Sequence, residues 1–180
     1  MNRAERRAVA RANKRGTMSR AAAKALAWRP TYSSTELLMA DAERPMTSAR
    51  ARHQLTRMYL AMEAIARGQH STGEDWRLLT DAINLMETLV TAGIARDESA
   101  LLTDAVTAVA KAWERSGRTG EGMRLDGPGL AACRAVLADW SAAVQQLPER
   151  TILAAHVATE RRIHSILTRS DVREHDVIAL

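Results

Sequence analysis

His156, Glu160 and His164 are the residues of this 180-residue sequence whose types and spacing are best suited to chemistry. Successive members lie four positions apart, so a helix stacks them along one face. Two imidazoles and a carboxylate in such a row can ligate a metal ion, exchange protons or form a buried hydrogen-bonded network. The sequence holds neither an HExxH motif nor paired ExxH motifs, and no further metal ligand is evident.

The same face of this predicted helix also carries large apolar side chains. They are Ile152, Leu153, Val157, Ile163 and Leu167. An unpaired buried carboxylate is costly, so we expect Glu160 to be bonded inside the protein, to His156, to His164 or to an arginine of another helix. A structural polar network is therefore the interpretation that we favour. A solvated rim on a less deeply packed helix, a metal site and a catalytic site stay open as alternatives.

A glycine-rich stretch, GRTGEGMRLDGPG at residues 117–129, invites comparison with phosphate-binding loops. Neither the dinucleotide-binding G-x-G-x-x-G motif after a strand nor a P-loop G-K-[ST] motif is present, so no cofactor is predicted. We interpret the stretch as a connection between two helices, with Asp126 as N-cap and Pro128 in the first turn. The alternative is an anion site at that helix end, assisted by Arg118 and Arg124.

Cys133 is the single cysteine of the chain, which excludes a disulfide within it. It falls on an apolar stripe with Leu130 and Leu137, so we expect a buried structural thiol rather than a nucleophile. A reducing, cytoplasmic setting follows as an expectation. No apolar run approaches the roughly 18–20 residues that a membrane span needs, and no contact with a membrane is expected.

The positive charge of the chain is concentrated near its N-terminus. Residues 1–60 contain 13 Lys or Arg against four acids, whereas residues 61–180 contain 13 against 17. A basic arm on a mildly acidic body is typical of proteins that contact nucleic acid. The side chains expected to neutralise phosphates are Arg3, Arg6, Arg7, Arg11, Lys14, Arg15, Arg20 and Lys24, with Arg29 following them.

This contact is expected to be independent of base sequence and sensitive to salt. The arm has few large apolar groups, so we expect it to be disordered or to fold on a partner; a solubilising tail is the alternative. The sequence shows no RNP motif, no zinc-finger spacing and no aromatic residues interleaved for base stacking.

The elements that must position these residues are predicted to be helices. The chain has no Phe and is rich in Ala, which favours an all-α fold, a bundle of about five helices over residues 47–169. Residues 1–46 are assigned to the basic arm and a linker with one short helical turn around 36–42, and residues 170–180 to a C-terminal tail. The expected helices cover residues 47–67, 71–92, 97–116, 129–147 and 149–169.

The second of these helices is the predicted centre of the bundle. Its polar residues share one narrow arc and its apolar residues occupy the remainder, which requires more than one neighbour. Trp76 in this helix and Trp140 in the fourth lie on apolar stripes, so both are predicted to be in the core.

Two stretches, EDWRLLTDAINLMETLVTAGI at residues 74–94 and RTGEGMRLDGPG at residues 118–129, carry a resemblance. In them the chain resembles small helical proteins encoded by phages and prophages of proteobacteria, over residues 55–147. The resemblance implies a bacterial or viral cytoplasmic setting and disfavours a metabolic enzyme. It transfers no catalytic or binding residue to this chain.

We therefore expect a non-enzymatic accessory or regulatory protein that contacts the phosphate backbone of nucleic acid through its basic arm. The alternative is an inhibitor or adaptor whose helical surface binds a host or defence protein. A third hypothesis is a hydrolytic or metal enzyme built on the last helix. The sequence does not predict the oligomeric state.

Overall fold

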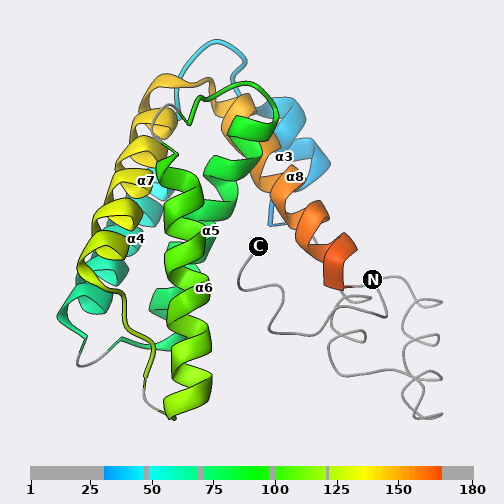
Figure 1. Cartoon of the computed structure of the whole chain (residues 1–180). Helices are drawn as coiled ribbons and strands as arrows, with labels where there is room; N and C mark the ends of the chain where they lie inside the picture. Colours follow the sequence, from blue (N-terminus) through cyan, green and yellow to red (C-terminus); the bar gives the residue numbers. More distant parts are fainter. Residues whose placement is uncertain (1–30, 47–48, 69–70, 98–99, 121, 168–180) are drawn as a thin grey trace, which may run out of the picture.

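Six helices form the described part of the molecule. The computed structural model describes residues 31–46, 49–68, 71–97, 100–120 and 122–167. Its helices gather into one bundle (Figure 1). The all-α bundle of about five helices predicted from composition is confirmed, with one short helix added at its edge. In chain order the helices are α3 (Ser34–Met39), α4 (Ala49–Arg67), α5 (Gly73–Thr91), α6 (Leu101–Thr119), α7 (Gly127–Gln146) and α8 (Glu149–Leu167).

Helix α5 lies at the centre, as its wide apolar arc predicts. It packs against α4, α6, α7 and α8. Helix α7 in turn packs against α4, α6 and α8 as well as α5. Trp76, Leu79 and Leu89 of α5 are buried, as is Trp140 of α7, so both tryptophans predicted to be in the core are there. The core is built from Leu, Met, Val, Ile and Ala, which the absence of Phe requires.

Helices α4 and α5 end at Arg67 and Thr91, close to the predicted ends at residues 67 and 92. Gly68 after α4 and Gly93 after α5 adopt φ values of +71° and +69°, the left-handed conformation that glycine adopts at little cost. Two capping boxes are compatible with the sequence, Ser71 with Glu74 and Thr72 with Asp75, and the structure has the second of them at the start of α5.

Helix α6 differs from the prediction at both ends. It starts at Leu101 rather than near residue 97, because Asp97 acts from outside the helix and accepts a hydrogen bond from the Leu102 N–H at 3.3 Å. It also continues through Gly117. The residue with left-handed φ that ends it is Gly120, at +70°, since a single helical glycine costs only about 1 kcal/mol.

Helix α7 has the predicted N-cap but begins at Gly127 rather than at residue 129, and it approaches α6 closely. The Asp126 side chain accepts from the Gly129 N–H at 2.8 Å, and Pro128 occupies the first turn. A Cβ atom at Gly129 would lie 2.7 Å from the Cβ of Ala108, so this glycine permits the close contact between the two helices.

Residues 31–46 pack against α8 instead of forming the linker that their prolines and small polar residues predict. Tyr32, Ala40 and Met46 are buried. The short helix is α3, Ser34–Met39, rather than residues 36–42; the side chains of Ser33 and Glu36 close a capping box at its start. Helices α3 and α8 lie side by side (Figure 1).

The same segment supplies hydrogen-bond acceptors for the first turn of α8. The N–H of Glu149 donates to the carbonyl of Arg44 at 2.8 Å, and the N–H of Arg150 donates to the carbonyl of Asp41 at 2.9 Å. The Arg150 side chain in turn donates to the carbonyl of Ala40 at 3.0 Å, just after α3. Helix-terminal N–H groups that have no partner within the helix are thus satisfied by residues 41–44.

None of the described helices combines the length and apolar character needed to cross a membrane.

Candidate functional site

A half-open pocket of about 490 Å³ lies where residues 31–32 meet helices α4, α5 and α8. It brings ionisable side chains from three helices together. Its lining consists of Thr31 and Tyr32, of His53, Gln54 and Arg57 from α4, of Arg77, Leu78, Asp81 and Leu85 from α5, and of His156, Thr159, Glu160 and Ile163 from α8.

Glu160 is held by the main chain rather than by a histidine or an arginine. Its two carboxylate oxygens accept from the backbone N–H of Thr31 at 2.9 and 3.2 Å. The predicted pairing with His156, His164 or an arginine of another helix is therefore wrong. The prediction failed because residues 31–46 pack on α8. They bring the Thr31 N–H to the face of α8 that we expected another helix to cover.

His156 and His164 have different surroundings. His156 is buried, with its ring between those of Tyr32 and Trp140, at centroid distances of 5.1 and 5.8 Å. It lines the pocket together with Glu160, whereas His164, two turns further along α8, does not. The structure thus brings two of the three residues to one pocket. In the described ranges, no three His, Cys, Asp or Glu side chains are grouped to hold a metal ion.

A polar network does join α8 to α5, but other residues form it. The Arg162 guanidinium contacts the Glu87 carboxylate at 2.6 Å and donates to the Asn84 side-chain oxygen at 3.4 Å. The hydroxyls of Thr88 and Thr159 share a hydrogen bond at 2.6 Å. The signal was present in the sequence, because the narrow polar arc of α5 holds Asn84, Glu87 and Thr88.

Asp81 is the pocket residue that sequence reasoning did not single out. Burial raises the pKa of its carboxyl to about 6; Arg77 opposes this rise, and the nearby Glu74 and Glu160 carboxylates add to it. Among the described residues, none donates a hydrogen bond to Asp81. Asp81 is only partly buried, so its carboxylate keeps acceptor positions that face the pocket.

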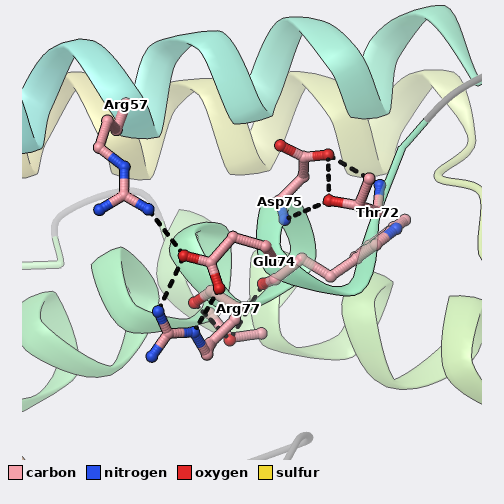
Figure 2. Close-up of polar contacts among 7 residues, drawn as sticks. Arg57, Thr72, Glu74, Asp75 and Arg77 are labelled. Atoms are coloured by element: carbon pink, nitrogen blue, oxygen red, sulfur yellow. Dashed lines mark hydrogen bonds and ion pairs between the residues drawn. The ribbon is translucent and has the colours of Figure 1, made fainter.

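The two arginines of the pocket direct their hydrogen bonds to Glu74, which is not part of the pocket lining (Figure 2). Arg57 of α4 donates to one carboxylate oxygen at 2.7 Å, and Arg77 donates to both oxygens at 2.9 and 3.0 Å. The hydrogen bond from Arg77 is the largest of the effects that hold the pKa of Glu74 below its ordinary value. These side chains are about half exposed, so the cluster positions the arginines more than it stabilises the fold.

The glycine-rich stretch contains the end of α6, the connection that we expected and the first turn of α7. The carboxylate of Asp126 itself caps α7, which places a negative charge where an anion would bind. Cys133 is fully buried, and burial, with a smaller effect of Asp126, raises the pKa of its thiol to about 12. Such a thiol is not a nucleophile at neutral pH.

The outer surface of α4 carries large apolar side chains. Tyr59 and Leu60 are exposed, and with Leu55 they line a shallow groove bordered by Arg52 and Glu63.

The predicted phosphate-contacting residues lie outside the described residues. They are Arg3, Arg6, Arg7, Arg11, Lys14, Arg15, Arg20, Lys24 and Arg29.

Comparison with protein-family models, with curated proteins and with solved structures finds no match to this chain. The resemblance to phage and prophage proteins therefore stays a prediction.

Proposed function

We propose that this chain is a non-enzymatic accessory or regulatory protein of phage type, which contacts the phosphate backbone of nucleic acid through its basic N-terminal arm. The observation that carries the proposal is the distribution of charge. Residues 1–30 contain nine Lys or Arg and one acid, whereas residues 31–180 contain 17 against 20. An arm of this composition on a weakly acidic body gathers positive charge where it can meet a polyanion.

The residues that follow the arm in the sequence are packed on the bundle. Thr31 is bonded to Glu160 of α8, and Tyr32 is buried against His156. The arm is thus attached to a packed part of the bundle.

Removing the arm tests the proposal directly. Fluorescence anisotropy with a labelled DNA duplex compares the full chain with residues 30–180, which keep the Thr31–Glu160 bond. Because the arm holds most of the excess positive charge, we expect affinity to fall at least about tenfold, from the micromolar range typical of non-specific binding.

A matched pair of charge variants separates the arm from positive charge in general. One variant changes Arg3, Arg6, Arg7 and Arg11 to Gln, and the control changes the exposed Arg67, Arg118, Arg124 and Arg161 to Gln. The arm variant should lose affinity and the control should keep most of it. Equal losses would contradict a role specific to the arm.

A second candidate function is the binding of a host or defence protein through the helical surface. The exposed Tyr59 and Leu60 on α4 favour it, because large apolar side chains exposed together often mark a contact surface. The test is capture from nuclease-treated host lysate. A protein retained by residues 30–180 and by Leu38→Glu, but lost with Leu60→Glu, would favour this function over the first; Leu38 is equally apolar and exposed on α3.

A further inference from the structure

The pocket between α4, α5 and α8 has no part in the proposed function. Its volume of about 490 Å³ is within the range of roughly 300–1,000 Å³ that small-molecule sites occupy. One part of its wall is apolar, with Leu78, Leu85 and Ile163. Another part carries the carboxylates of Asp81 and Glu160. This combination suits a ligand with one charged end and one apolar part.

Neither carboxylate of the pocket is saturated with hydrogen bonds. No described residue donates to Asp81, and Glu160 receives only the Thr31 N–H. An ionised carboxylate has about four acceptor positions, so both side chains keep acceptor capacity for a ligand. The pKa of the Asp81 carboxyl is raised because burial and the neighbouring Glu74 and Glu160 carboxylates outweigh the attraction of Arg77.

The arginines do not turn the pocket into an anion site. Arg57 and Arg77 donate to Glu74, whose negative charge offsets part of theirs (Figure 2). An anion in the pocket would also face the Asp81 and Glu160 carboxylates, and like charges in a partly buried site repel. A cation, in contrast, balances the negative charge of the Asp81 and Glu160 carboxylates and brings N–H groups that can donate to them.

We propose that this pocket binds a small organic cation, with an ammonium or guanidinium group donating to Asp81 and Glu160 and an aliphatic or aromatic part against Leu78, Leu85 and Ile163. Such charge-assisted hydrogen bonds are the stronger kind, and the apolar wall adds the hydrophobic contribution. This site is separate from the arm, so its existence does not depend on nucleic-acid binding.

Calorimetric titration of the full chain at neutral pH with agmatine, 1,4-diaminobutane and benzylamine tests the proposal, with pentanoate as the anionic control. We expect saturable binding of at least one of the three cations and none of pentanoate. Asp81→Asn removes the charge and should weaken binding at least about tenfold, as the loss of a charged hydrogen-bond partner of ~1.5–3 kcal/mol requires. Asp139→Asn, at an exposed site on α7, is the matched control and should bind like the wild type.

Glu160→Gln provides a second variant, because it keeps an oxygen that can accept from Thr31 while removing the charge. It should also weaken cation binding. The proposal is overturned if none of the three cations binds saturably, if pentanoate binds as well as they do, or if Asp81→Asn binds them with wild-type affinity.

Discussion

The backbone N–H of Thr31 donates to both carboxylate oxygens of Glu160, although 129 positions separate the two residues in the sequence. This contact joins the beginning of the described body to the middle of α8. The carbonyls of Asp41 and Arg44, which accept from the first turn of α8, make a second junction between the same two segments. Residues 31–46 and α8 therefore form one packed unit, and the arm precedes it directly.

The Thr31–Glu160 contact predicts a graded response to substitution. Glu160→Ala removes the acceptor and should lower the free energy of unfolding by about 1 kcal/mol, the usual contribution of one hydrogen bond. Glu160→Gln keeps an acceptor oxygen and should cost less. Denaturant unfolding measures both, and amide hydrogen exchange at Thr31 should accelerate more in the Ala variant. Unchanged exchange at Thr31 in both variants would show that the contact does not form in solution.

Gly129 and Gly117 should respond to alanine in opposite directions. A Cβ at Gly129 would meet Ala108 at 2.7 Å, so Gly129→Ala should cost ~1–3 kcal/mol through overpacking of α6 against α7. Nothing lies within 4 Å of a Cβ at Gly117 in α6, so Gly117→Ala should stabilise by up to about 1 kcal/mol. Thermal unfolding of the two variants checks this, and stabilisation by both would contradict the close approach of the helices.

Trp140 and Trp113 provide a comparison between a core and a surface tryptophan. Trp140 is fully buried and packs on His156, so Trp140→Ala should cost ~3–5 kcal/mol. Trp113 on α6 is 37% exposed, so Trp113→Ala should cost clearly less than Trp140→Ala. Denaturant midpoints of the two variants measure the difference. Similar losses would mean that the face of α6 carrying Trp113 is covered in solution.

Asp81 should give the stability of the protein a specific pH dependence. Its pKa in the folded state, about 6, lies above the ordinary value of 3.8. The folded state therefore holds this proton more tightly, and the associated stabilisation is full below the ordinary pKa and is lost as pH rises through about 6. A difference of about two pKa units corresponds to ~3 kcal/mol, an upper bound because Asp81 keeps some exposure.

The measurement is urea unfolding of the wild type and Asp81→Asn at about pH 7.5 and about pH 5. The Asn variant should be the more stable protein at the higher pH, and its advantage should shrink at the lower pH. Other carboxylates titrate in both proteins, so the difference between the two isolates Asp81. An advantage that does not depend on pH would contradict the raised pKa.

Local signals in the sequence were sufficient for much of the fold. The glycines at 68 and 93 and the Asp126 cap act within one helical turn, so spacing alone reveals them. For α5, spacing leaves two capping boxes possible, and the structure has that of Thr72 and Asp75. The C-terminal end of α6 was predicted too early because Gly117 and Gly120 could each end the helix. Only the backbone conformation shows which of them ends the helix.

The pocket could not be predicted because it depends on long-range packing. The segment that contains Tyr32 and Met46 has no helical or strand period, so nothing local shows that it is buried. Glu160 was singled out on α8, but its partner is a backbone N–H that any residue except proline could supply. Asp81 lies on the polar arc of α5. Its place in the pocket follows only from the packing of α4, α8 and residues 31–32 around it.

The dependence of nucleic-acid affinity on salt is the most direct test of the proposed function. Each phosphate that the arm neutralises on a DNA duplex should add about −0.9 to the slope of log K against log salt concentration. With nine basic residues before Thr31, we expect a slope on the order of −5 for the full chain and a slope near zero for residues 30–180. Equal slopes for the two proteins would contradict the assignment of nucleic-acid contact to the arm.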